Sequence, residues 1–90
     1  MSIKVHLYST LPQFTNGQNM AEVNGNTIGE CLGDLVMQFP KIKPVLFDKD
    51  GELFGHVFVS VNLKSVYPEE LNKLVNDGDE LYIVLTIAGG

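Results

Sequence analysis

The chain opens on residues that alternate between apolar and polar, the pattern of a strand with one buried face. Residues 3–8 read Ile-Lys-Val-His-Leu-Tyr, and successive side chains of a strand point to opposite faces of a sheet. A weaker run ends at Val23, after Asn16-Gly17 in a short polar stretch. The two runs predict an opening β-hairpin, which a turn at residues 24–26 follows.

The next segment has the start signal, the periodicity and the stop signal of an α-helix. Thr27 stands where an N-cap belongs, and Glu30 three residues later completes a capping box. Pro40 ends the helix, because proline cannot continue the hydrogen-bond ladder. Gly29 and Gly33 lie off the apolar stripe, and we assign them no role. The stripe recurs at spacings of three and four residues and consists of Ile28, Cys31, Leu32, Leu35, Val36 and Phe39.

Short elements are predicted in the middle of the chain. Residues 44–47 suit a turn of helix, residues 48–51 suit a turn, and residues 52–54 suit a short strand. Residues 57–61 alternate again, with valines on one face. The opposite face of this strand carries His56, Phe58 and Ser60.

The last part of the chain predicts a brief helical stretch and a final strand. The helical stretch opens at Pro68 and runs to Val75, with Leu71 and Leu74 between them. Asp-Gly-Asp then forms a turn. One face of the final strand, residues 81–87, carries Leu81, Ile83, Leu85 and Ile87, and the other carries Tyr82, Val84 and Thr86.

This order of elements predicts an α+β fold. The helix must cover one face of the sheet, and the last strand is apolar enough to be central. Placing that strand beside the first, in parallel, puts both apolar rows under the helix. The prediction is a β-grasp, a mixed sheet with one main helix across one face, as a single domain over residues 1–90. Cys31, Leu35, Val59 and Ile83 should be buried together.

Charge and composition limit the possible partners. The formal net charge is -5, from six Lys/Arg and eleven Asp/Glu, which argues against binding nucleic acid, since that requires clustered cations. The charge suits either simple solubility or docking onto a basic protein surface. No signal peptide or membrane-spanning run is present, so we expect a cytoplasmic protein with no membrane partner. Cys31 is the only cysteine, which excludes an internal disulfide and agrees with a reducing compartment.

Few side chains suggest a catalytic or metal site. His6 and His56 have no converging partners in the sequence, and we interpret them as surface or partly buried histidines. Cys31 lies on the apolar stripe and is interpreted as a small core residue. The turn at residues 48–51 resembles the start of a calcium loop, but its glycine is misplaced and the rest of the loop is missing. We therefore expect no metal, no bound cofactor and no stand-alone enzyme.

The strongest functional signal is the end of the chain, Ala88-Gly89-Gly90. Glycine lacks a β-carbon, so this tail could extend through a channel too narrow for other residues. Extended, the three residues would span about 10 Å, enough to deliver a carboxylate into the active site of a partner. A carboxylate must be activated before it reacts, which implies adenylylation with ATP by a partner enzyme and then acyl transfer. An inert tail is the alternative interpretation.

Several motifs occur in an order that resembles a known family, the ubiquitin-like sulfur carriers of the MoaD/ThiS type. They are Thr27-Ile28-Gly29-Glu30 before Leu32 and Leu35, Val59-x-Val61-Asn62, Asp77-Gly78-Asp79-Glu80, and Gly89-Gly90. The resemblance covers nearly the whole chain and implies a β-grasp fold. It also implies an E1-like adenylyltransferase/sulfurtransferase that adenylylates Gly90, with Gly89 as its slender neighbour. Sulfur transfer then gives a thiocarboxylate, which a synthase consumes.

The resemblance leaves the pathway open between molybdopterin and cysteine biosynthesis. Residues 83–86, Ile-Val-Leu-Thr, depart from the aromatic pair and two prolines usual in molybdopterin-synthase small subunits. The Ala-Gly-Gly ending and the long segment at residues 40–55 look more like the cysteine-pathway carriers. Two other functions use the same fold. One is a ubiquitin-like protein modifier that forms isopeptide bonds, and the other is a plain interaction module that needs no diglycine.

The predicted partner surface is the sheet face that the helix leaves uncovered. Phe58 and Val84 should lie there as exposed apolar residues near the tail, where a partner gains by burying them. The alternative is that loops or a second small core cover Phe58.

Overall fold

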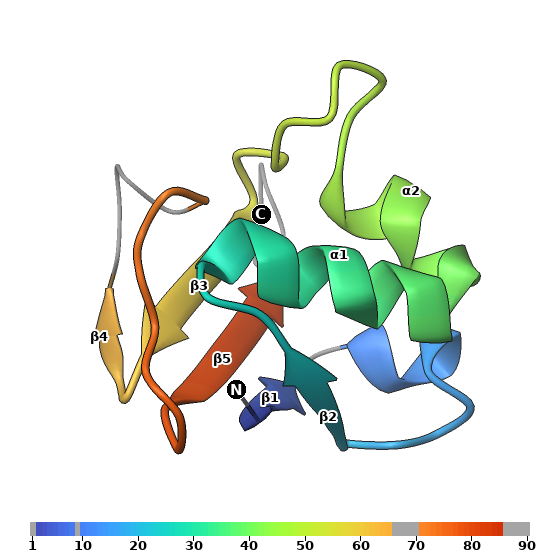
Figure 1. The fold of residues 1–90 in the computed structure, drawn as a ribbon. Coiled ribbons are helices and arrows are strands. Elements are labelled where there is room, and N and C mark those ends of the chain that lie inside the picture. The colour runs from blue at the N-terminus through green and yellow to red at the C-terminus, as the bar shows by residue number, and fades with distance from the viewer. Residues whose placement is uncertain (1, 9, 66–70, 86–90) are drawn as a thin grey trace.

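A five-stranded sheet in the order β2-β1-β5-β3-β4 organises the fold. The computed structural model describes residues 2–8, 10–65 and 71–85. The strands are β1 (Ser2–Leu7), β2 (Met20–Asn24), β3 (Val57–Val61), β4 (Lys64–Ser65) and β5 (Glu80–Leu85). β1 and β5 pair in parallel, and the other neighbouring pairs are antiparallel. The mixed sheet with its last strand beside its first confirms the predicted β-grasp arrangement (Figure 1).

The main helix, α1 (Ile28–Gln38), crosses one face of this sheet (Figure 1). Its predicted capping is confirmed, since the Glu30 amide donates to Thr27 Oγ1 at 3.1 Å. The Glu30 carboxylate in turn accepts the amide of Asn26 at 2.9 Å, one residue before the N-cap. Three shorter helical pieces flank the sheet: η1 (Leu11–Phe14), η2 (Pro40–Ile42) and α2 (Lys43–Leu46). The predicted helical turn at residues 44–47 corresponds to α2.

The core forms between α1 and the inner face of the sheet. Cys31, Leu35, Val59 and Ile83 are all buried, as predicted. The valines of β3 also face inward, while Val36 and Phe39 of the helical stripe pack against the core and stay partly exposed. The main buried set comprises Ile3, Val5, Leu7, Leu11, Ala21, Val23, Ile28, Cys31, Leu32, Leu35, Ile42, Leu46, Val57, Val59, Val61, Val75, Leu81 and Ile83.

The strand predicted at residues 52–54 is wrong. Only one isolated bridge forms there, between Phe47 and Leu53. The local hydrogen bonds explain why, because Asp48 N donates to Glu52 O at 2.8 Å and closes a tight loop directly after α2. A loop of this kind leaves no room for a longer ladder.

The helical stretch predicted at residues 68–75 is wrong for the part that the structure describes, residues 71–75. This segment runs beside the start of α1, and its carbonyls accept helix amides that have no partner within the helix. The two bonds, each 3.0 Å long, are Ile28 N to Lys73 O and Gly29 N to Leu71 O. Tertiary bonding to α1 has therefore replaced local helical bonding. Residues 68–70 lie outside the described residues.

Gly29 has a packing role that the sequence interpretation did not assign. A β-carbon at this position would meet the Leu71 carbonyl oxygen at 3.0 Å, whereas one at Gly33 would meet no atom within 4 Å. The absence of a side chain at Gly29 lets the 71–75 segment approach the helix closely.

Asn62 connects two of the motifs that resemble those of the sulfur carriers, the one that ends at Asn62 itself and the one at residues 77–80. Its side-chain amide donates to Asp79 Oδ1 at 3.1 Å, and its side-chain carbonyl accepts the Glu80 amide at 3.0 Å. The Asn76 amide donates to the other Asp79 oxygen at 2.8 Å. The bond from Asn76 and that from Asn62 lower the pKa of Asp79, because both stabilise the carboxylate. The turn after β3 is thereby fixed to the start of β5.

Within the described part of the chain, no helix is long and apolar enough to cross a membrane.

Candidate functional site

The sheet face turned away from α1, here called the open face, carries the side chains that alternate with the core rows. It lies behind the sheet in the view of Figure 1. Strand register sets its rows: Met20, His6, Tyr82 and Ser60 align across β2, β1, β5 and β3, and Phe58 aligns with Val84 one step further along β5. The open face thus combines residues from four strands.

Phe58 and Val84 are exposed at the end of the open face where β5 finishes. They stand directly opposite each other across the β3–β5 pair, with 49% and 37% of their surface accessible. The prediction that these side chains are exposed is confirmed, and among the described residues no loop buries Phe58. Tyr8 and Met20 are also exposed on this face, so the apolar surface extends across β1 and β2. A surface of this kind favours a protein partner.

An aromatic stack with one carboxylate occupies the middle of the open face. The His6 ring stacks on Tyr82 with centroids 4.5 Å apart, and the Tyr8 ring also lies nearly parallel to Tyr82, with centroids 6.2 Å apart. His6 Nε2 contacts Glu80 Oε1 at 2.5 Å. Desolvation, followed by the nearby Glu80 charge, raises the pKa of Tyr82, so its phenol keeps its proton near neutral pH. The stack provides a rigid polar anchor within an apolar surface.

A hollow of about 390 Å³ adjoins this stack at the end of β1. Its walls include His6, Tyr8, Pro12 and Asn19. Aromatic and proline walls favour an apolar side chain, so a partner could place one beside the stack.

Charge is concentrated at the opposite end of the open face. Lys4 pairs in register with Glu22 on one side and Glu80 on the other. Asp77 and Asp79 border the same end, where Asp77 accepts the Ser2 amide at 2.8 Å. The open face is therefore acidic at the start of β5 and apolar at its end.

The remaining candidate side chains have structural roles. Cys31 is buried, and burial followed by the nearby Glu30 charge raises the pKa of its thiol, which agrees with its interpretation as a core residue. His56 stacks on Phe54 with centroids 5.2 Å apart.

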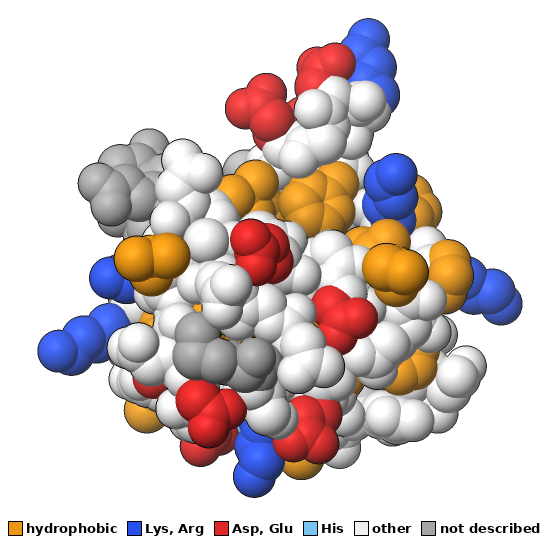
Figure 2. Space-filling model, in the orientation of Figure 1, with side chains coloured by type: hydrophobic (Ala, Val, Ile, Leu, Met, Phe, Trp, Pro, Cys, Tyr) orange, Lys and Arg blue, Asp and Glu red, His pale blue; other side chains and the backbone are white. Residues whose placement is uncertain are grey.

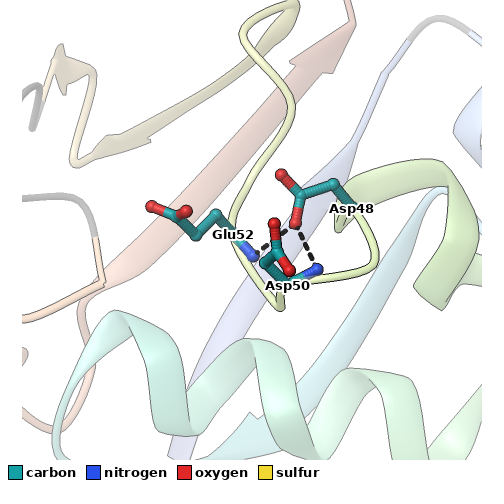
Figure 3. Close-up of side chains that lie close together, drawn as sticks. All are labelled: Asp48, Asp50 and Glu52. Atoms are coloured by element: carbon teal, nitrogen blue, oxygen red, sulfur yellow. Dashed lines mark hydrogen bonds between the residues drawn. The ribbon is translucent and has the colours of Figure 1, made fainter.

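The acidic turn at residues 48–52 closes its own loop (Figure 3). Asp48, Asp50 and Glu52 each place one carboxylate oxygen within 4.8 Å of the others. Asp48 Oδ1 accepts the amides of Asp50 at 2.8 Å and Glu52 at 3.1 Å, which explains the turn without a ligand. Nothing else points to a metal here, and we assign no site.

The tail residues Ala88, Gly89 and Gly90 lie outside the described residues. The structure does describe the strand that leads toward them, because β5 is held between β1 and β3 at the centre of the sheet. β5 is paired with β3 up to Leu85, the last described residue.

Comparison with known families decides the identity of the chain. The model of the ThiS family matches residues 5–90. The chain belongs to the ThiS family. The matched stretch includes both Gly89 and Gly90, as well as every motif on which the resemblance was based.

Relatives and solved structures support the same assignment over the full length. The sulfur carrier protein CysO of Mycobacterium tuberculosis is 30% identical, with all of both chains covered. The crystal structure of SAMP1 from Haloferax volcanii is 28% identical, covers all of both chains and has a TM-score of 0.88. The CysO chain in the BexX/CysO complex of Amycolatopsis orientalis is 30% identical, with 98% and 99% of the chains covered and a TM-score of 0.87.

Sequence reasoning missed the stack formed by His6, Tyr82, Tyr8 and Glu80. The signal was available, because parallel pairing of the first and last strands places His6 beside Tyr82 on the open face. The short contact between His6 and Glu80 depends on side-chain rotamers and could not be predicted from alternation.

Proposed function

We propose that this ThiS-family chain is a sulfur carrier that works through the carboxylate of Gly90. The observation that carries the proposal is the family match through residue 90, combined with a relative that is matched over its full length and is named a sulfur carrier. The described residues add no rival catalytic group, since His6 is engaged by Glu80 and Cys31 is buried. The chain acts as a co-substrate of its partners rather than as a catalyst.

The proposed reaction has two steps. An E1-like adenylyltransferase/sulfurtransferase binds ATP, and the Gly90 carboxylate attacks the α-phosphorus to form an acyl-adenylate and release pyrophosphate. A sulfide equivalent from the sulfur donor then attacks the acyl carbon, and AMP leaves with one oxygen of the original carboxylate. The product is a thiocarboxylate in which one oxygen of Gly90 has been replaced by sulfur. ATP belongs to the partner enzyme, and the carrier itself holds no cofactor.

The open face is the proposed docking surface for the activating enzyme. Phe58 and Val84 lie at the end of β5 from which the tail continues, so a partner that buries them holds the carrier beside its own active site. The Amycolatopsis relative forms a complex with the protein BexX, which supports a partner-binding role for this fold. The sulfur acceptor is a synthase of cysteine or molybdopterin biosynthesis.

Changes to the tail test the reaction without changing the core. Deleting Gly90 withdraws the carboxylate by about 3.5 Å, beyond the reach needed for in-line attack on a phosphate. Gly89→Val adds a branched side chain where a narrow channel would enclose the tail. We expect both variants to fold, and the activating enzyme to convert neither to the acyl-adenylate.

Intact-mass analysis after incubation with the enzyme, ATP and a sulfur donor measures the outcome. Wild-type protein should exchange one oxygen for sulfur, and fragmentation should place the change at Gly90. The control is Gly33→Ala, an exposed helix position that meets no neighbouring atom, which should react like wild type. Sulfur found on Cys31 as a persulfide, with Gly90 unmodified, would overturn the mechanism.

A second function, protein modification, is favoured by the likeness to a small archaeal modifier protein of Haloferax volcanii, which is 29% identical over 93% of this chain. The same acyl-adenylate would then react with a lysine amine and form an isopeptide bond. Mass spectrometry of proteins from cells that express the carrier distinguishes the two, because conjugates leave a Gly90–lysine linkage. A plain interaction module is the third possibility, and it would keep its role after loss of both glycines.

A further inference from the structure

The turn between β3 and β4 lies beside the start of β5. β3 runs antiparallel to β5, so Val61 at the end of β3 pairs with Leu81 at the start of β5. Leu85, the last described residue, pairs with Val57 at the other end of that strand. A surface at this turn therefore lies at the end of β5 opposite Leu85.

Leu63 occupies this turn in a strained and exposed conformation. Asn62 and Leu63 form a two-residue loop, and their φ angles are +52° and +71°, which is the pattern of a type I′ turn. Asn tolerates positive φ, but a bulky residue such as leucine rarely adopts it. Leu63 gains no burial in return, since 76% of its surface is exposed. A strained residue without a core role is a reason to look for a function.

The turn is also rigid, which suits a binding surface. The Asn62 side chain forms hydrogen bonds with both Asp79 and Glu80, and the backbone amide of Asn62 donates to the Glu80 carbonyl at 2.8 Å. These three bonds fix the orientation in which Leu63 leaves the surface.

A hollow of about 380 Å³ lies beside the turn. Leu74 lines it with 73% of its surface exposed, and Lys64 and Lys73 line it as well. The hollow thus combines an exposed apolar side chain with two cations. Figure 2 shows basic side chains projecting from this flank of the molecule, at the left of the view.

The charges favour an acidic ligand here, in contrast to the rest of the molecule. Lys64 and Lys73 are two of only six basic residues in a chain of net charge -5. No described carboxylate lies within 4 Å of either ammonium group. Asp79 also lines the hollow and interacts electrostatically with Lys73, whose charge helps to lower the Asp79 pKa. One carboxylate thus faces two lysines, which leaves the lining with an excess of positive charge.

We propose that Leu63, Lys64, Lys73 and Leu74 form a second interaction surface, the far-end surface, that binds an extended acidic segment of a partner protein with interspersed leucine-like residues. The two lysines meet carboxylates of the segment, and the two leucines meet its apolar side chains. This surface lies at the start of β5, and the chain continues toward Gly90 after Leu85 at the other end of that strand, so one protein can hold the carrier while another engages Gly90. The proposal does not depend on the chemistry at Gly90.

A peptide titration followed by NMR tests the proposal. The probe is the synthetic peptide acetyl-Glu-Leu-Glu-Glu-Leu-Glu-amide, added to ¹⁵N-labelled carrier at low salt, where charge pairing is screened least. We expect amide shifts at residues 62–64 and 73–76, and none at Phe58 or Val84. The same peptide with lysine in place of glutamate should shift none of these amides.

Charge reversal and a glycine substitution supply the matched variants. Lys64→Glu with Lys73→Glu should weaken binding at least about tenfold, whereas Lys41→Glu with Lys43→Glu, the same charge change at exposed positions elsewhere, should leave it unchanged. Leu63→Gly should also weaken binding while its Tm stays equal to or above that of wild type, because glycine accepts positive φ without strain. The proposal is wrong if the acidic peptide shifts no amide of wild type, shifts only the open face, or binds Leu63→Gly as tightly as wild type.

Discussion

At the scale of the residue, the exposed pair Phe58 and Val84 contributes little to stability and more to binding. Both lie on a central part of the sheet, yet both leave apolar surface in water. An apolar cross-strand pair adds about 0.2–1 kcal/mol to the stability of a sheet, which is far less than a fully buried pair would add. Their main value is therefore the surface that a partner can bury.

Phe58→Ala should separate binding from stability. We expect a Tm within about 8 °C of wild type, since the lost cross-strand contact is worth at most about 1 kcal/mol in a domain of this size. Binding to the activating enzyme should weaken at least about tenfold, as at a typical interface hot spot. Calorimetry for Tm and fluorescence anisotropy for affinity measure the two effects.

Met37→Ala is the matched control for Phe58→Ala. Met37 is 81% exposed on α1, on the other side of the molecule, and its truncation should change neither Tm nor binding. Equal loss of affinity in the two variants would show that the open face is not the docking surface.

At the scale of the element, some features of α1 are determined by local sequence and others by contacts with distant residues. Its start, its stripe and its end were predictable, because the cap and the spacing of its apolar residues lie within one short stretch of sequence. The role of Gly29 was not predictable, because the atom that demands a glycine is the carbonyl of Leu71, far along the chain. The same contact explains why residues 71–75 are not helical, despite leucines at helical spacing.

Two substitutions in α1 should therefore differ in effect. Gly33→Ala replaces an exposed glycine in a helix interior and should stabilise the protein by about 0.5–1 kcal/mol, which raises Tm by about 2–8 °C. Gly29→Ala offers the same gain in helix propensity, but its β-carbon meets the Leu71 oxygen at 3.0 Å, so we expect a smaller gain or a loss. Thermal unfolding followed by circular dichroism compares the two variants. An equal rise in Tm would show that the Leu71 carbonyl can move away from the added β-carbon at no cost in stability.

Side chains of α1 also cover the outer edge of β2, which is an edge strand of the sheet. Asp34 accepts the Asn24 amide at 2.9 Å, and Gln38 donates to the Glu22 carbonyl at 2.9 Å. Exposed edges invite pairing with other chains, so these two bonds favour a carrier that meets its partners through the open face.

At the scale of the whole molecule, the strand order was predictable and the distribution of charge on the open face was not. The apolar rows of residues 3–7 and 81–85 require the same helix cover, which places the first and last strands side by side. The acidic end of the open face, by contrast, gathers Glu22, Asp77 and Asp79 from separate parts of the chain. No periodicity in the sequence reports such a cluster.

The acid stability of the fold should depend on Asp79. Hydrogen bonds from Asn76 and Asn62 lower its pKa below the ordinary value of 3.8. A lowered folded-state pKa stabilises the protein above the unfolded-state pKa, and this contribution is lost as pH falls through the folded-state pKa. Asp79→Asn should therefore be less stable than wild type at pH 7, by only about 0.5 kcal/mol because the group is partly exposed and solvent screens its interactions.

Urea unfolding at several pH values measures this dependence. The difference between wild type and Asp79→Asn should shrink once pH falls below about 3.8, where the carboxyl group becomes neutral in both folded and unfolded chains. If the difference in free energy of unfolding stays constant down to pH 2, the hydrogen-bond geometry of the Asp79 side chain, and not its charge, determines the stability at this position.

The parallel pairing of β1 with β5 has a consequence for how the protein is made. A ribosome releases residues 2–7 first, but the strand that completes their hydrogen bonding, residues 80–85, comes near the end of synthesis. The nascent chain can pair β1 with β2, but the other edge of β1 stays open until then, because contacts between distant segments form late and slowly. An interrupted chain would lack both the C-terminal glycines and the central strand, so we expect it to remain unfolded and open to proteolysis. Translation that stops before β5 should therefore give an unfolded chain that is degraded. Such a chain would not fold and compete with the complete protein for the proposed activating enzyme.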